Sequence, residues 1–98
     1  MADRIVAAPE VLGLDDREAF RRAALDALDT LAGGGRLVIG LAATRAIDSA
    51  GLGTLLLVER RAAERGIAVV LRDPTDEVRF LLMVTRLAER FILEGPAG

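Results

Sequence analysis

The stretch LVIGLAATRAIDSAGLG, residues 37–53, decides the fold expected for this chain. Its first six residues, 37–42, are apolar and rich in branched side chains, which favours a short buried strand over a helix. From residue 52 onward, leucines and then charged residues recur at helical spacing, with apolar side chains on one side and charges on the other. We therefore expect a strand at 37–42, a helix from about 50 to 65, and Ser49 at the junction between them.

Towards the amino terminus, residues 4–8 are expected to form a short first strand, which Pro9 ends because proline has no N–H for a ladder. A helix follows, with Asp15 or Asp16 as its N-cap. The triple glycine at 33–35 is expected to end this helix and turn the chain into the strand at 37–42. The apolar residues of the helix share one face because their spacings are four, four and three: Phe20, Ala24, Leu28 and Leu31.

Towards the carboxyl terminus, Gly66 suits the left-handed position after the end of the second helix. Residues 67–71 form another continuous apolar run, which predicts a second buried strand. Residues 73–77 then predict a turn into a third helix, with Thr75 as a candidate cap. The apolar face expected for this third helix comprises Val78, Leu81, Leu82 and Thr85.

The last part of the sequence predicts a final strand at 90–93 and a frayed tail at 94–98. Both Phe80 and Phe91 are expected in the core, because aromatic burial dominates small cores. Strands that are apolar throughout and alternate with helices predict an α/β fold. We expect a single domain over 1–98, with a mixed, largely parallel sheet of about four strands packed with three to four helices.

Composition narrows the possible functions. The 13 basic and 15 acidic residues are mixed along the chain and give a net charge of −2, so no basic block is available for nucleic acid or anionic lipid. The sequence shows no signal-peptide core and no apolar run long enough for a membrane span. We therefore expect a cytoplasmic protein with neither nucleic-acid nor membrane partners.

Histidine, cysteine and lysine are absent from the sequence. Their absence removes the usual zinc ligands, imidazole-activated nucleophiles, disulfides and Schiff bases, so we expect no metal, no cofactor and no enzyme activity. A small enzyme with Asp48 as base and Ser49 as nucleophile would have to work without imidazole or lysine. Its one cation close in sequence would be Arg45.

Ser49, the only serine, has two interpretations. The first amides of a helix lack intrahelical partners and the helix dipole adds partial positive charge, so a phosphate on Ser49 would be stabilised there. Alternatively, Asp48 or Ser49 is simply the N-cap of the helix, since both residue types accept a hydrogen bond from its second or third amide.

Residues 37–93 resemble the STAS family, the domain shared by anti-sigma factor antagonists and the cytoplasmic tails of sulfate transporters. The order of an apolar strand, the residues 47–53, an amphipathic helix closed by Gly66, a strand and a proline-bearing turn is that of the family. In bacterial members, the serine after the aspartate is phosphorylated by a partner that is both a serine kinase and an anti-sigma factor. The resemblance thus implies Ser49 as the phosphorylation site. It implies a partner-binding surface made of Asp48, Ser49, Ala50, Gly51, Leu52 and Gly53.

The resemblance further implies that the unphosphorylated form binds the kinase and frees a sigma factor, whereas the phosphorylated form lets go. A phosphoserine adds about −1.5 to −2 charges beside Asp48, so like-charge repulsion and desolvation would weaken docking. The alternative is a constitutive STAS interaction subunit of a transporter ATPase or a signalling assembly, without phosphorylation.

The chain departs from the family pattern in three places. Ala50 stands where many members have a second Ser or Thr, so a second phosphorylation site is missing. The usual first hairpin is shortened, and an uncovered sheet edge would invite pairing with another chain, such as a second copy in a homodimer. Thr44 and Arg45 precede the motif in a loop, where we expect them to be solvated.

Gly51 and Gly53 each cost the helix roughly 1 kcal/mol relative to alanine. Either the missing side chains let a partner backbone come close to Ser49, or they allow close packing of the helix against a neighbouring strand. The sequence leaves both explanations open.

Overall fold

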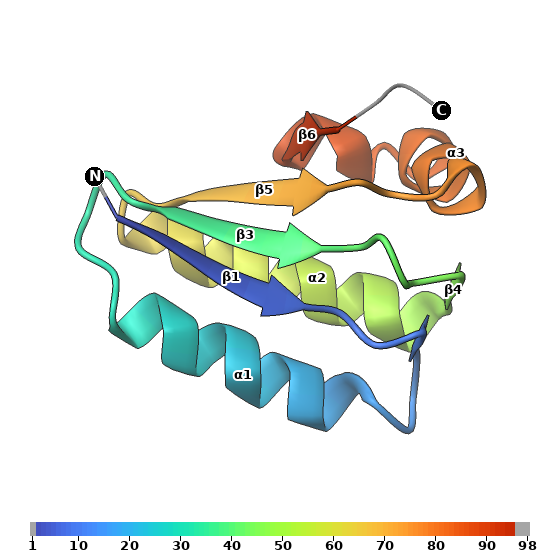
Figure 1. Cartoon of the computed structure of the whole chain (residues 1–98), viewed down its shortest axis with the longest axis horizontal. Coiled ribbons are helices and arrows are strands. Elements are labelled where there is room, and N and C mark those ends of the chain that lie inside the picture. Colours follow the sequence, from blue (N-terminus) through green and yellow to red (C-terminus); the bar gives the residue numbers. More distant parts are fainter. Residues whose placement is uncertain (1, 96–98) are drawn as a thin grey trace.

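The computed structural model describes residues 2–95, and within them the chain forms an α/β fold (Figure 1). The strands are β1 (Asp3–Ala7), β2 (Val11–Leu12), β3 (Arg36–Gly40), β4 (Ala46–Ile47), β5 (Ala68–Arg72) and β6 (Ile92–Glu94). The helices are α1 (Arg17–Asp29), α2 (Ser49–Glu64), α3 (Asp76–Val84) and the short 3₁₀ helix η1 (Leu87–Arg90). The strands and helices expected from the sequence are confirmed, most of them with boundaries shifted by one or two residues. The end of the first helix is the exception, because α1 stops at Asp29 with Thr30 as its C-cap, before the triple glycine that was expected to end it.

The main sheet has the strand order β1-β3-β5-β6, and every pairing between its described strands is parallel. Helical crossovers bring each strand back in the same direction, which is the physical reason for the parallel arrangement. A second, two-residue parallel pairing joins β2 to β4, with Val11 opposite Ala46 and Leu12 opposite Ile47. This small sheet lies beyond the carboxyl ends of the main strands, beside the start of α2 (Figure 1).

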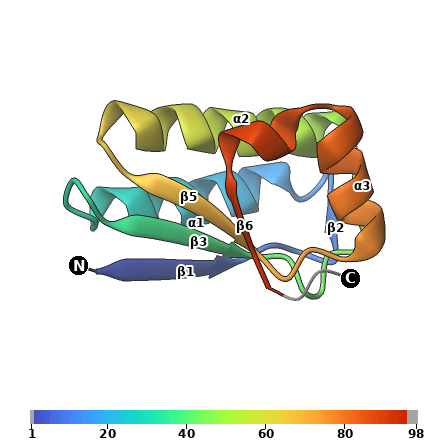
Figure 2. The ribbon, with the colours of Figure 1, turned by 90° about the horizontal axis from the view of Figure 1, so that it is seen from above.

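The hydrophobic core lies between the main sheet and the helices α1 and α2, which cover one face of the sheet (Figure 2). Alternate residues of the two central strands point into this core: Leu37, Ile39, Val69 and Leu71. From α1 the expected face is confirmed, because Phe20, Ala24 and Leu28 are all buried, with Leu31 just beyond the helix. The core therefore fixes where α2 begins relative to the sheet.

The opposite face of the sheet carries one apolar row flanked by charges. Strand register aligns the row across all four strands: Ile5, Val38, Val70 and Ile92. On the same face Arg36 forms ion pairs with Asp3 at 2.7 Å and with Glu94 at 3.7 Å. The pair with Glu94 joins β3 to β6 and so crosses β5. Val38 and Val70 are fully buried, although no described helix packs on this side.

The local turn chemistry follows the sequence closely. Gly66 directly follows Arg65, the C-cap residue of α2. Its φ of 68° is the left-handed conformation expected for it. Thr75 is the N-cap of α3, and its hydroxyl oxygen accepts a hydrogen bond from the Val78 amide at 3.3 Å. For α1 the predicted N-cap residue is confirmed, because Asp16 stands at that position. Its side chain, however, makes no capping hydrogen bond.

The prediction that Phe80 belongs to the core is wrong, because its side chain is 67% exposed. Helix α3 packs through Val78 and Leu82, and a residue midway between them in sequence points to the opposite side of a helix. Thr85 is also misplaced in the expected apolar face. It is the exposed C-cap residue of α3, and its hydroxyl donates to the carbonyl of Leu81 at 2.7 Å. Phe91 is buried as predicted.

The predicted tail begins too early in the sequence. Glu94 is the last residue of β6, and its carboxylate pairs with Arg72 at 2.7 Å, so it belongs to the sheet. Residues 96–98 of the predicted tail lie outside the described residues. Within residues 2–95, no helix combines the length and the apolar character needed to cross a bilayer.

Candidate functional site

The loop that carries the motif into α2 is held against the start of the chain. Thr44 is fully buried, and its hydroxyl donates to the carbonyl of Pro9 at 2.8 Å. Arg45 donates from its backbone N–H to the carbonyl of Glu10 at 2.9 Å and pairs with the Glu10 carboxylate at 2.7 Å. The expectation that Thr44 is solvated is therefore wrong. Its role is to anchor the loop to the segment between β1 and β2.

Asp48 is the N-cap of α2 and also binds a second segment. Its Oδ1 accepts a hydrogen bond from the Gly51 amide at 2.9 Å, and its Oδ2 accepts one from the Leu14 amide at 3.1 Å. Its own amide donates to the carbonyl of Leu12 at 3.2 Å. The capping interpretation is thus confirmed for Asp48, which joins the first turn of α2 to the chain that leads from β2 to α1.

These hydrogen bonds set the charge state of Asp48. The Gly51 amide, and after it the amides of Leu14 and Ala50, hold the pKa of the Asp48 carboxyl below its ordinary value, although desolvation by neighbouring groups opposes them. The positive charge of Arg17 lowers this pKa further. Asp48 is therefore a carboxylate whose oxygens are occupied by backbone donors.

Ser49 is the first residue of α2, and its side chain is exposed. Among residues 2–95, no partner hydrogen-bonds to its hydroxyl. The residue lines a shallow hollow of about 390 Å³ between α1 and α2, together with Ala50 and Gly53. Of the predicted site residues, Ser49, Ala50 and Gly53 therefore share one open surface. Asp48 and Gly51 instead face the β2 segment, and Leu52 packs partly against the core.

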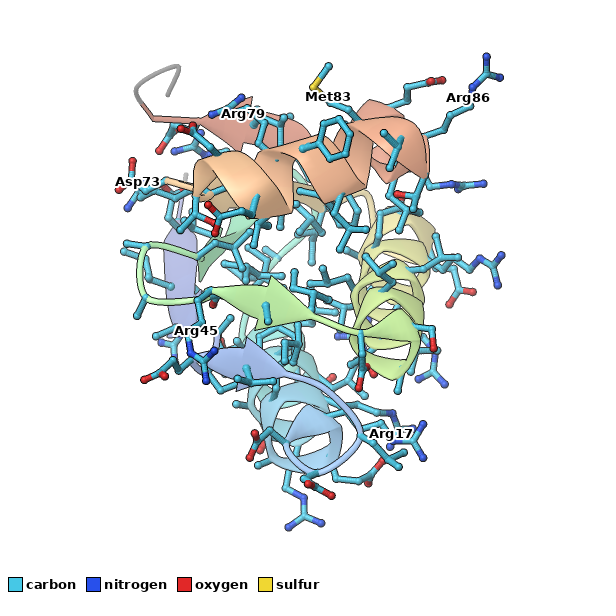
Figure 3. The ribbon with its side chains drawn as sticks, turned by 90° about the vertical axis from the view of Figure 1, so that its right-hand side faces the viewer. Arg17, Arg45, Asp73, Arg79, Met83 and Arg86 are labelled. Atoms are coloured by element: carbon cyan, nitrogen blue, oxygen red, sulfur yellow. The ribbon has the colours of Figure 1, made fainter. Side chains whose placement is uncertain are left out.

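Two arginines of α1 line the same hollow as Ser49, and sequence reasoning missed them. Arg17 and Arg21 are one turn apart on α1, and both belong to the lining of the hollow. Figure 3 shows Arg17 extending from α1 on the side where α2 lies. In the sequence they are ordinary charges on the polar side of an amphipathic helix. Only the packing of α1 against α2 brings them close to a residue about thirty positions later.

The two glycines of the motif have different surroundings. A Cβ on Gly51 would overlap the carbonyl oxygen of Leu12 and lie 2.9 Å from Cγ2 of Ile47. Gly51 is buried, and its missing side chain allows the backbones of α2 and β2 to touch. Gly53 is exposed, and a Cβ there would meet no atom within 4 Å. Close packing thus explains Gly51, whereas Gly53 leaves the surface beside Ser49 bare.

An apolar surface on α3 adjoins the motif on its other side. Phe80, Met83 and Val84 are exposed large hydrophobic residues, and Figure 3 shows Met83 directed away from the body of the protein. A hollow of about 270 Å³ separates α3 from β4 and is lined in part by Ile47, Phe80 and Leu81. Exposed apolar residues that gather on one short helix mark an interaction surface more often than scattered ones do.

The arrangement does not resemble a metal centre. Within residues 2–95, no group of three or more acidic side chains is placed to hold a metal ion, and the sequence has no histidine or cysteine. What the site offers is an exposed hydroxyl, a bare helix surface, and two guanidinium groups in the lining of the hollow together with the carboxylate of Glu18, which lies 3.9 Å from Arg21.

The different surroundings of the glycines give a matched pair of stability predictions. Gly51→Ala is expected to destabilise the fold by about 1–3 kcal/mol, because the added methyl group must push α2 away from Leu12. Gly53→Ala is expected to stabilise it by up to about 1 kcal/mol, because the space is open and alanine favours helix. Urea unfolding followed by circular dichroism measures both. Equal effects of the two substitutions would contradict the assignment of Gly51 as the packing glycine.

Residues 2–94 match the family model described as "Mlab, STAS domain". A comparison with curated proteins finds no match. Among solved structures, an anti-sigma-factor antagonist (STAS) domain protein from Planctomyces limnophilus superposes with a TM-score of 0.82 at 18% identity, covering 94% of this chain and 81% of that one. A Thermotoga maritima protein described as an anti-sigma factor antagonist gives 0.78 at 20% identity, covering 95% and 80%.

A sulfate transporter family protein from Wolinella succinogenes also has the same fold, with a TM-score of 0.69 at 14% identity, covering 93% of this chain and 75% of that one. At these identities the three structures show likeness of fold alone. The family model adds the sequence signal and spans almost all of the described residues. The chain belongs to the STAS domain family.

Proposed function

We propose that this chain is a protein-binding module of the anti-sigma factor antagonist type, switched by phosphorylation of Ser49. In the unphosphorylated form it binds a serine kinase that is also an anti-sigma factor, and sigma-factor-dependent transcription follows. Phosphorylation of Ser49 by that partner ends the complex. The module acts in the cytoplasm as a partner-switching component.

The observation that carries this proposal is the exposed Ser49 hydroxyl at the first turn of α2. Asp48 takes over the capping of the helix, so the hydroxyl of Ser49 is not needed for it. A phosphate at this position would lie at the positive end of the α2 dipole, which stabilises an anion. It would also carry about −1.5 to −2 charges into the open surface formed by Ser49, Ala50 and Gly53, which opposes docking of an acidic or apolar partner surface.

Binding rather than catalysis fits the chemistry of the site. An enzyme with Asp48 as general base needs a carboxylate that is free to take a proton. Backbone donors occupy both oxygens of Asp48 and hold its pKa low, which makes it a poor base. The exposed apolar residues Phe80, Met83 and Val84 instead supply the hydrophobic contact that a docking surface requires.

A constitutive interaction subunit is the second candidate. It is favoured by the match to the "Mlab, STAS domain" model and by the fold shared with a sulfate transporter family protein. In that role the chain would bind a transporter ATPase or a signalling assembly through the same surface, and Ser49 would stay unmodified.

Substitution of Ser49 separates the two candidates. Ser49→Asp is expected to weaken binding to a serine kinase/anti-sigma factor encoded beside this gene at least tenfold, about 1.4 kcal/mol, because it places a fixed negative charge on the contact surface. Isothermal titration calorimetry against that kinase gives the dissociation constants. Two results together would leave only the constitutive role. Ser49→Asp would bind every tested partner with unchanged affinity, and the kinase with ATP would not phosphorylate the wild-type chain.

Two further variants serve as controls in the same titration. Ala63→Asp adds the same charge to an exposed position near the far end of α2 and should bind like wild type. Phe80→Ala removes the largest exposed apolar side chain of α3 and should weaken binding, since interface anchors are commonly aromatic.

The phosphorylated form should be stabilised within the chain itself. Arg17 and Arg21 line the hollow that Ser49 opens into, and their guanidinium groups can pair with a phosphate there, with Arg21 exchanging its loose 3.9 Å contact with Glu18 for the phosphate. Such pairing favours the dianion over the monoanion, so the second pKa of the phosphoserine should fall below its ordinary value of about 6. The arginines would then hold the phosphate against α2 when the partner has left.

A phosphorus NMR titration tests this pairing on protein that carries phosphoserine at position 49. The double variant Arg17→Ala/Arg21→Ala is expected to raise the phosphate pKa back towards about 6, because the nearby positive charges are gone. Arg22→Ala is the matched control, since Arg22 is exposed on the same helix and does not line the hollow. The same pKa in all three proteins would show that the arginines do not contact the phosphate.

A further inference from the structure

We propose that β1 is a dimerisation strand, which pairs antiparallel with β1 of a second copy about a two-fold axis at Ile5. This inference is independent of the phosphorylation switch. It rests on the open edge of the main sheet, on the register that this edge permits and on the apolar face that the pairing would extend.

The backbone of β1 presents unpaired groups along its outer side. The Ala2 carbonyl accepts from the Arg36 amide at 3.2 Å, and the Ala8 amide donates to the Gly40 carbonyl at 2.9 Å, so the even-numbered residues face β3. Backbone groups alternate in direction along a strand, and therefore Asp3, Ile5 and Ala7 direct both N–H and C=O outward. No other described strand lies beside them. Such an edge is a template for pairing with another chain.

The edge is also accessible. Asp3, Arg4, Ile5 and Ala7 are all exposed, and Ile5 is exposed to 65%. The opposite edge, β6, is only three residues long, and η1 packs beside it. Because the Glu94 carbonyl already accepts from the Asp73 amide at 2.8 Å, only Leu93 of β6 directs its backbone groups outward. Of the two edges in residues 2–95, β1 is the one suited to pairing.

Register selects the two-fold axis. Centring an antiparallel pair on Ile5 places Asp3 opposite Ala7 of the second copy and uses all three outward residues, on the order of six hydrogen bonds. Centring on Asp3 or on Arg4 would place like charges opposite each other, which is unfavourable. Centring on Ala7 would place Ile5 opposite Pro9, which has no N–H. Centring on Val6 would pair only Ile5 and Ala7 within β1, and would leave Asp3 facing Pro9.

The pairing at Ile5 also covers apolar surface. Ile5 is the exposed end of the row that continues through Val38 and Val70 to Ile92. In the dimer the two Ile5 side chains would meet on this face and join the two rows, while Asp3 keeps its ion pair with Arg36. Ser49 lies at the start of α2, beyond the carboxyl ends of the strands and away from the outer side of β1 (Figure 1). A dimer of this kind would display two copies of the open surface that carries Ser49.

One short strand per copy buries little area, so we expect a weak dimer whose population rises with concentration. The chain has no cysteine, and a single introduced cysteine is therefore a clean reporter. Facing residues in a hydrogen-bonded antiparallel pair have Cα atoms about 5.5 Å apart, within the range that a disulfide spans. Ile5→Cys should form a disulfide-linked dimer under mild oxidation. Ile92→Cys, at the exposed end of the same row on the other edge, should not.

Mixed cysteine variants test the register. Asp3→Cys and Ala7→Cys should each form no disulfide-linked dimer on oxidation when alone, and should cross-link when mixed, because Asp3 faces Ala7 of the second copy. Analytical ultracentrifugation of the wild-type chain should show a mass that increases with concentration. A monomer at every concentration, or cross-linking of Ile5→Cys no faster than of Ile92→Cys, would overturn the proposal. Cross-linking of Ile5→Cys with Ala7→Cys in preference to Ile5→Cys with itself would overturn the register.

Discussion

The close contact between the backbones of β2 and α2 is the constraint on which the site depends. The carbonyl of Leu12 lies where a side chain on residue 51 would be, and it accepts a hydrogen bond from the Asp48 amide. Asp48 in turn accepts hydrogen bonds from Gly51 and from Leu14, so one carboxylate holds both segments. A buried Gly13 makes room for this carboxylate, since a Cβ there would lie 2.6 Å from Oδ2 of Asp48. The first turn of α2 is thereby fixed in position, and Ser49 with it.

This arrangement divides the motif into a structural half and an exposed half. Gly51 is buried and serves packing, and the exposed Asp48 uses its carboxylate for capping, whereas Ser49, Ala50 and Gly53 form the open surface. A helix start that already has a cap can present a second hydroxyl without losing stability, because the serine is not needed to satisfy the helix amides. The hydroxyl is then available for modification. Arg17 and Arg21 of α1 place two positive charges in the same hollow against the one negative charge of Glu18, which is the basis for proposing that a phosphate on Ser49 is held there.

Sequence reasoning predicted most of the fold because its signals were local. Residues 37–42 and 67–71 read as buried strands, and the helical spacing after residue 52 placed α2 to within one residue of its observed ends. It placed Phe80 wrongly because a short helix of nine residues can bury either of two apolar sides, and the sequence does not show which one meets the body. The burial of Thr44 was not predicted because its hydrogen-bond partner, the carbonyl of Pro9, lies far away in the sequence.

The candidate site was only half predictable. The position of Ser49 at a helix start followed from pattern alone, and the roles of Gly51 and Gly53 could not be separated until the position of β2 was known. Arg17 and Arg21 became part of the site only through the packing of α1 on α2.

The most direct measurement is phosphorylation-site mapping of the wild-type chain by mass spectrometry, after incubation with ATP and the serine kinase proposed as its partner. The position of Ser49 predicts one phosphate per chain, on that residue. The same digest should show Thr54 unmodified, because that threonine is buried and its hydroxyl donates to the Ala50 carbonyl at 2.9 Å. A phosphate on a threonine instead, or no phosphate from a kinase that modifies other substrates, would contradict the central role given to Ser49.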